Sequence, residues 1–221
     1  MKKNKKAFTL AEVIITLGLI GVVSAMSIPT LISSFKAREV ETKLKEVYST
    51  LQYAVAAYDG AYTKTYTTNS FYNTFIKNRV HSLTPCTSGT DCFVDVKTLN
   101  GGSFSPRGKT FIMPDGSHIL FGTSGSNFYK NHGIKINGVE DNATIQLVIY
   151  TDVNGSKFPN TIGKDIYIMG WNGKKLVPAG YDIPYEELKK HCTSEDSAGS
   201  GIFCMQKVIS DGWKVDSKLL K

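Results

Sequence analysis

The sequence predicts an α+β fold: one long N-terminal helix, with a membrane half and an amphipathic half, packed on an antiparallel sheet of four or five strands. Two patterns predict this. In residues 40–58, apolar side chains recur every three or four positions between charged ones, which is typical of a helix lying on a core. From Lys109 onward, short apolar runs are separated by turn residues such as Asp115-Gly116, which is typical of hairpins. Because an apolar sheet face needs a cover, we expect the helix to provide it.

The expected elements can be placed along the chain from these patterns. The helix should run from residue 8 to residue 58, ending at Asp59-Gly60. We expect shorter helices near residues 70–80 and 185–190. The strands are expected at residues 110–113, 117–121, 143–151, 165–169 and 174–177.

The first half of the long helix is apolar enough to cross a membrane. Residues 8–32 form a run of 25 residues with one charged side chain, Glu12, whereas about 20 residues span a bilayer core. A carboxylate in a span costs roughly 2.5–3.5 kcal/mol, which makes Glu12 a candidate functional residue. The four lysines of the leader all lie on one side of the run, which predicts a cytoplasmic N-terminus: Lys2, Lys3, Lys5 and Lys6.

Residues 6–12, KAFTLAE, resemble the N-terminus of type IV prepilins and type II secretion pseudopilins. The resemblance implies a pilin-like fold, with cleavage by a prepilin peptidase between Ala7 and Phe8 and N-methylation of Phe8. It places Glu12 at the acidic position of the mature chain. Members of the family usually have glycine before the cut, where this chain has Ala7.

The resemblance also implies a function, a location and partners. It predicts a structural subunit of a type IV pilus-like or type II secretion filament, anchored by a single pass in the bacterial inner membrane with its head outside the cytoplasm. The filament would be periplasmic or on the cell surface. Expected partners are copies of the chain, other pilin-like subunits, a prepilin peptidase, an inner-membrane assembly platform and the lipid bilayer. The chain then divides into a leader, an assembly helix, the amphipathic half of that helix and a globular head: residues 1–7, 8–32, 33–60 and 61–221.

Glu12 has two interpretations. In a bundle of such helices, its buried carboxylate can pair with the free α-amino group of Phe8 on a neighbouring subunit, since buried charges are tolerated mainly when paired. This pairing would set the stagger between subunits. In the plainer interpretation, Glu12 lies near the membrane edge and its side chain reaches water.

The stretch from Gly21 to Pro29 is the weakest part of the predicted span. Glycine lowers helix propensity, and proline removes one backbone hydrogen bond. Two interpretations stay open: a segment that unwinds on assembly, as the family resemblance implies, or a fixed kink at Pro29.

The four cysteines indicate an extracytoplasmic domain with disulfides. Three pairings are possible, and the simplest one closes two short loops, Cys86–Cys92 and Cys192–Cys204. A zinc site is less favoured, because no C-x-x-C spacing occurs.

The segment from Asp152 to Asp165, DVNGSKFPNTIGKD, is a turn-rich connection that resembles a loop found in many pseudopilin heads. Asp152, Asn154 and Asp165 could offer oxygen ligands to calcium. The spacing is not that of a complete EF-hand loop, and side-chain oxygens that cap turns explain the same residues without a metal.

Charge and motifs argue against two other classes of protein. The net charge of +7 falls to +3 without the four leader lysines, and no basic cluster in the rest of the chain suggests a nucleic-acid partner. We expect no enzyme, because the common catalytic motifs are missing. The histidines show no metal-ligand spacing: His81, His118, His132 and His191.

The competing function is a secreted or membrane-anchored binding protein, an adhesin or lectin, with an ordinary signal peptide. Val23-Ser24-Ala25 resembles a signal-peptidase site before Met26. In that case Glu12 would lie in the apolar part of the signal peptide, where a charge is unfavourable. The helical stripe after residue 40 would also need a different partner.

Overall fold

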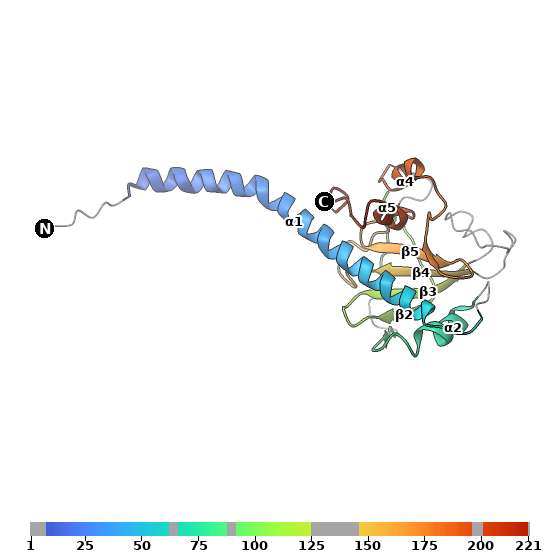
Figure 1. The fold of residues 1–221 in the computed structure, drawn as a ribbon. Helices are drawn as coiled ribbons and strands as arrows, with labels where there is room; N and C mark the ends of the chain where they lie inside the picture. Colours follow the sequence, from blue (N-terminus) through green and yellow to red (C-terminus); the bar gives the residue numbers. More distant parts are fainter. Residues whose placement is uncertain (1–7, 62–65, 88–91, 125–145, 196–200, 221) are drawn as a thin grey trace.

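The structure is a computed structural model that describes residues 8–61, 66–87, 92–124, 146–195 and 201–220. Helix α1 (Leu10–Ala56) extends far out of a compact head, with one half free and the other half lying on the head (Figure 1). The helix is continuous through Gly21 and Pro29, and it bends between its free and packed halves (Figure 1). The predicted long helix is therefore confirmed, with its ends two residues inside the predicted ones.

The head contains one antiparallel sheet whose strands lie side by side in chain order. The described residues form six strands, slightly more than the four or five predicted, and the one that was missed is β1, which has only two residues and shows no alternation in sequence. Of the strand predicted at 143–151, residues 143–145 lie outside the described residues. Within the described residues the strands are β1 (Thr84–Pro85), β2 (Lys109–Ile112), β3 (His118–Ser124), β4 (Gln146–Asp152), β5 (Ile166–Trp171) and β6 (Leu176–Pro178).

The packed half of α1 covers one face of this sheet. Phe121, Ile149 and Met169 are aligned across β3, β4 and β5, and all three are fully buried in the same cluster as the helix. Each fully buried apolar side chain stabilises the folded state by about 1.5–3 kcal/mol relative to an exposed one. The buried positions of the helix follow a spacing of three and four that begins after the apolar run: Ser33, Ala37, Val40, Leu44, Val47, Leu51 and Ala54.

The other face of the sheet is covered as well, which the sequence did not predict. A second cluster of buried side chains includes Leu120, Val148 and Ile168, which alternate with the residues that face α1. Leu188 of α4 (Tyr185–His191) and Phe203 pack against this cluster. Strand β5 is consequently buried along its whole length.

Aromatic side chains close the core near the C-terminal end of α1. The short helices α2 (Thr68–Phe71) and η1 (Tyr72–Ile76) lie where a helix was predicted. Phe71 and Phe75 lie 5.8 and 5.5 Å from Trp171, measured between ring centroids. These contacts hold α2 and η1 on the sheet face that α1 covers.

The C-terminal part of the chain returns to α1. Trp213 contacts Tyr48 with ring centroids 5.5 Å apart, and the backbone N–H of Val215 donates to the carboxylate of Glu41 at 2.9 Å. The side-chain amide of Gln52 donates to the backbone oxygen of Leu176, which ties α1 to the edge strand β6. Polar contacts at Glu41 and Gln52 therefore add to the apolar packing that fixes the helix to the head.

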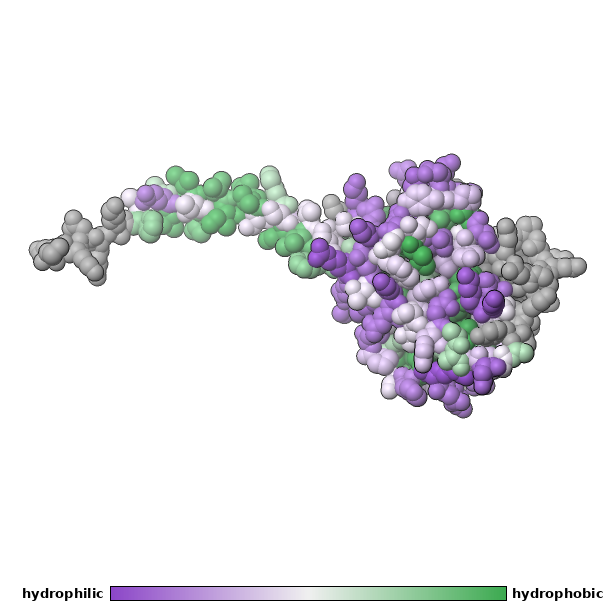
Figure 2. All heavy atoms as spheres, in the orientation of Figure 1, coloured by the Kyte–Doolittle hydropathy of each residue, from purple (hydrophilic) through white to green (hydrophobic). Residues whose placement is uncertain are grey.

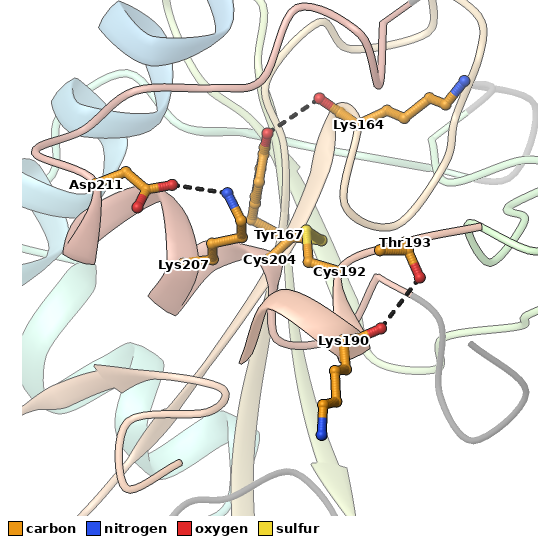
Figure 3. Close-up of a disulfide and its surroundings, with 8 residues drawn as sticks. All are labelled: Lys164, Tyr167, Lys190, Cys192, Thr193, Cys204, Lys207 and Asp211. Atoms are coloured by element: carbon orange, nitrogen blue, oxygen red, sulfur yellow. Dashed lines mark hydrogen bonds and ion pairs between the residues drawn. A yellow bond between two sulfur atoms is a disulfide. The ribbon is translucent and has the colours of Figure 1, made fainter. Parts of the chain in front are cut away.

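Both disulfides have the pairing that was predicted as the simplest, Cys86–Cys92 and Cys192–Cys204. The second disulfide joins the end of α4 to the start of α5 (Cys204–Ser210) beside Tyr167 (Figure 3). This disulfide is buried and lies against Gly163. A Cβ atom added to Gly163 would lie only 2.8 Å from the Sγ of Cys204, so a side chain does not fit there. The disulfide therefore also limits the position of the 152–165 loop.

We expect the Cys192–Cys204 disulfide to stabilise the head more than the Cys86–Cys92 disulfide. It closes the longer loop, and replacing both of its cysteines by alanine should lower the free energy of unfolding by about 3 kcal/mol. The same change at Cys86 and Cys92, which are only half-buried, should cost less. Guanidinium denaturation of the full chain in detergent measures both, and a larger loss at Cys86 and Cys92 would contradict this ranking.

Candidate functional site

The free half of α1 exposes almost all of its side chains. The most apolar 18-residue window of this helix has none of its residues buried in the chain itself. Figure 2 shows this half as a hydrophobic rod that ends where the hydrophilic surface of the head begins. By length and composition the helix can cross a membrane. Its exposed apolar residues include Leu10, Ile14, Leu17, Ile20, Met26 and Leu31, and Phe8, which precedes the helix, is exposed as well.

Glu12 lies in the first turn of α1 and takes part in a capping box. The backbone N–H and the hydroxyl of Thr9 each donate to the carboxylate of Glu12 at 2.8 Å. The backbone N–H of Glu12 donates in return to the Thr9 hydroxyl at 3.2 Å. This arrangement satisfies N–H groups that a helix start leaves unpaired. It fixes the helix start two residues after Phe8 and leaves Glu12 exposed.

The 152–165 loop is held together by the buried carboxylate of Asp165. One oxygen accepts from the backbone N–H of Thr161 at 2.6 Å, and the other accepts from the backbone N–H of Asn160 at 2.9 Å. The side-chain amide of Asn154 adds a third hydrogen bond at 2.9 Å. The structure thus brings Asn154 and Asp165 together, and turn capping accounts for the hydrogen bonds of Asp165.

Asn160 and Thr161 were missed as partners in this loop. Asn160 is buried, has a positive φ of 44°, and donates from its side chain to the backbone oxygen of Val94 at 2.8 Å. Asparagine tolerates this left-handed conformation better than most residues. The turn dipeptide Pro159-Asn160 was the available signal, but nothing in the sequence indicates that its N–H groups face Asp165.

Asp152 is fully buried and only half satisfied. One of its oxygens accepts from the backbone N–H of Asn154 at 3.2 Å, while the other has no hydrogen-bond partner. Burial, together with the charge of the nearby Asp165, raises the pKa of Asp152 to about 8, against the backbone hydrogen bonds from Asn154 and Gly155 and the charge of Lys43. Burial also raises the pKa of Asp165 to about 6, against the hydrogen bonds it accepts. At neutral pH the carboxyl group of Asp152 is therefore favoured in its protonated form, whereas Asp165 is mostly ionised.

The loop fits the predicted calcium only in part. The unpartnered oxygens of Asp152 and Asn154 are the kind of ligand that calcium takes. Against this, both oxygens of Asp165 already accept hydrogen bonds, and Asn154 turns its amide nitrogen toward that carboxylate. Across the described parts of the chain, no three His, Cys, Asp or Glu side chains form a group that could hold a metal. Calcium at this loop stays a prediction.

The histidines are not gathered into one site. His118 is buried next to β4, and burial lowers its pKa. His191 lies 3.7 Å from the carboxylate of Glu187 on α4, and His81 is exposed. His132 lies outside the described residues. The expectation that the chain is no enzyme rests on the sequence and stays a prediction.

Comparison with known families decides what the N-terminal segment is. Residues 2–28 match the family model of the prokaryotic N-terminal methylation motif. The chain carries a prepilin-type N-terminal segment. No curated protein and no solved structure matches the chain.

The prepilin-type segment supports a processed subunit of the pilin or pseudopilin type. The match covers Phe8 and Glu12 and ends one residue before Pro29. A long N-terminal helix on an antiparallel sheet is a pilin-like arrangement, so the fold and the segment agree. Ala7 and the leader lysines lie outside the described residues, so the cleavage site is assigned here from the sequence alone.

We expect the stability of the head to fall as the pH rises from about 4 to about 8, because the folded Asp152 and Asp165 keep protons that the unfolded carboxylates have lost. For each of the two carboxyl groups, the free energy of unfolding falls by at most about 1.4 kcal/mol per pH unit. Asp152→Asn should flatten this dependence and raise the stability at about pH 8. Guanidinium denaturation of the full chain across this pH range measures it, with the exposed Asp182→Asn as the matched control.

The charged and titratable groups that face Asp152 determine whether its pKa rises or falls on folding, and hence the direction of the pH dependence. They are Asp165, Lys43 on α1, and His118, which is its register partner on β3. If Asp152→Asn left the slope of the free energy of unfolding against pH unchanged, Asp152 would be ionised in the folded head.

The same denaturation series tests calcium. A calcium ion held by Asp152, Asn154 and Asp165 would stabilise the folded chain as its concentration rises. If calcium raises the stability at alkaline pH and Asp152→Asn abolishes that rise, the calcium prediction is correct. If calcium changes nothing in the unsubstituted chain, it is wrong.

Proposed function

We propose that this protein is a structural subunit, a pilin or pseudopilin, of a type IV pilus-like or type II secretion filament. A prepilin peptidase would cut between Ala7 and Phe8, and the chain would assemble through the free half of α1. The observation that supports this most is the prepilin-type segment on a helix whose N-terminal half leaves its apolar side chains unburied by the described part of the chain.

The apolar half of α1 would serve two environments in turn. Before assembly, residues 8–32 would cross the inner membrane as a single pass, because apolar side chains on all faces suit a lipid solvent. After assembly, the same side chains would pack against the helices of neighbouring subunits. Other pilin-like subunits, the prepilin peptidase and an inner-membrane assembly platform would be the remaining partners, and the filament would be periplasmic or on the cell surface.

Glu12 would direct this assembly by pairing with the α-amino group of Phe8 on a neighbouring subunit. Within one chain Glu12 is exposed, and among the described residues its carboxylate accepts hydrogen bonds from Thr9 alone. In a bundle of apolar helices this carboxylate would lose water, and a positive partner would then be required. Cleavage before Phe8 creates such a positive group at the same end of the helix.

We expect the mature protein to begin at Phe8 and to carry one added methyl group. Cleavage would remove the basic leader and leave the apolar run intact, whereas an ordinary signal peptidase would remove that run. Intact-mass measurement of protein extracted from membranes separates these outcomes. A mature chain that begins at Met26 would contradict the filament function and support the secreted binding protein.

We expect Glu12→Ala to abolish filament formation while the protein remains processed and anchored. The paired change Thr9→Val removes the capping hydroxyl but keeps the carboxylate, so it separates helix capping from pairing between subunits. Thr9→Val should still assemble, with a loss limited to the roughly 0.5–2 kcal/mol of a lost helix cap. Electron microscopy of sheared filaments and intact mass measure assembly and processing.

Equal loss of filaments in the two variants would show that Glu12 acts only as a local cap. Normal filaments from Glu12→Ala would remove any assembly role from this residue.

A further inference from the structure

A groove of about 140 Å³ lies where α1, the 152–165 loop and the C-terminal end of the chain meet. Its apolar wall includes Val40, Val153 and Leu220. We call it the basic groove, because four lysines from two separate segments line it: Lys36 and Lys43 of α1, and Lys157 and Lys164 of the loop.

The charge of the basic groove favours an anion. Lys43 lies 3.5 Å from the carboxylate of Glu39, which also lines the groove. In the described ranges of the chain, the other three lysines make no ion pair with a carboxylate. The remaining carboxylate of the lining, Asp165, is occupied by N–H groups of its own loop. Lysines in this setting can bind a phosphate group as point charges.

The basic groove lies next to the membrane span. Along the helix, Lys36 lies four positions, or about 6 Å, after Ile32, the last residue of the apolar run. Lys43 lies about 16 Å after Ile32. The headgroup layer of a bilayer is roughly 5–7 Å thick on each side of the hydrocarbon core. The end of the groove at Lys36 is therefore at headgroup depth when the helix stands upright, and tilting brings one side closer.

The loop that forms one wall also exposes an aromatic side chain. Phe158 is 78% exposed, more than any other large apolar residue after the span among those that the structure describes. It lies directly after Lys157. Phe35, at the end of the span, is 60% exposed. Aromatic and basic side chains side by side are typical of surfaces that rest on a lipid headgroup layer.

We propose that the basic groove binds the phosphate of an anionic phospholipid in the bilayer that holds the span, with Phe158 entering the headgroup layer beside it. This proposal rests on the proposed function, because it takes residues 8–32 to be inserted in a membrane. The volume of the groove suits a headgroup phosphate rather than an acyl chain. The contact would hold the head of an unassembled subunit against the membrane and would be broken when the subunit is extracted into a filament.

The test uses the full chain in lipid nanodiscs, with a nitroxide label on Ser156→Cys in the exposed part of the loop. All native cysteines are in disulfides, so the label is specific. We expect the label to be protected from a water-soluble nickel chelate in discs that contain phosphatidylglycerol, and not in discs of phosphatidylcholine alone. High salt should reduce the protection, since it screens exposed charges.

Charge reversal identifies the groove as the cause. Each lysine near an anionic surface contributes roughly a factor of five in affinity, so Lys157→Glu with Lys164→Glu should weaken the contact more than tenfold. Lys174→Glu with Lys175→Glu is the matched control, because β5 places that hairpin about 20 Å from the loop. The single change Lys157→Glu, at an exposed position, serves if the double variant does not fold.

The outcomes separate this proposal from the function on which it rests. A second label on Leu19→Cys reports insertion of the span. If that label faces water, the anchored-subunit function fails. If Leu19 is in lipid but the Ser156 label responds equally to both lipids, or equally to the control substitutions, the lipid proposal is overturned and the function stands. Protection that depends on several copies per disc, and not on phosphatidylglycerol, would assign the groove to a neighbouring subunit and would also overturn it.

Discussion

The structure depends on the packing of one half of α1 against the sheet while the other half stays free. The boundary between the free half and the packed half lies within a single helical turn. Ile32 is 48% exposed and Ser33 is 4% exposed, and the buried stripe runs from Ser33 toward the C-terminal end of the helix. Before this point every face of the helix is apolar, and after it only one face is. A helix with an apolar stripe needs a core, whereas a helix that is apolar all round needs lipid or other helices. The two halves therefore have different partners although the backbone is continuous.

The head is complete without the free half. Both faces of the sheet are covered, one by α1 and the other by α4 with Phe203. The edge strand β6 is tied to α1 through Gln52, and β1 at the opposite edge ends at Pro85, which cannot donate to a further strand. In the part of the chain that the structure describes, the exposed apolar side chains of the head are scattered, whereas those of the span are continuous. Changes in the span should thus affect anchoring and assembly more than folding.

The sequence predicted the features that depend on periodicity or on a turn signal. The long helix, the Asp115-Gly116 turn and the hairpin between β5 and β6 all follow local rules. It did not predict β1, since two residues carry no period, nor the second cover of the sheet, since Leu188 and Phe203 belong to short segments. The basic groove was missed for another reason. Lys36 and Lys164 are isolated in sequence and become neighbours only when the loop returns to α1.

The 152–165 loop shows why residue types could be predicted there but not their use. Asp152, Asn154 and Asp165 were singled out as possible calcium ligands, which stays a prediction, and the sequence does not show which of their atoms face which partner. In the structure the contacts that fix the loop include the Asp165 carboxylate, the hydroxyl of Tyr167 on the backbone oxygen of Lys164 at 3.1 Å, and the disulfide against Gly163. Burying two carboxyl groups costs stability. Because the fixed loop places Lys157 and Lys164 beside α1, the same buried pair that destabilises the head also determines the shape of the surface that it presents next to the span.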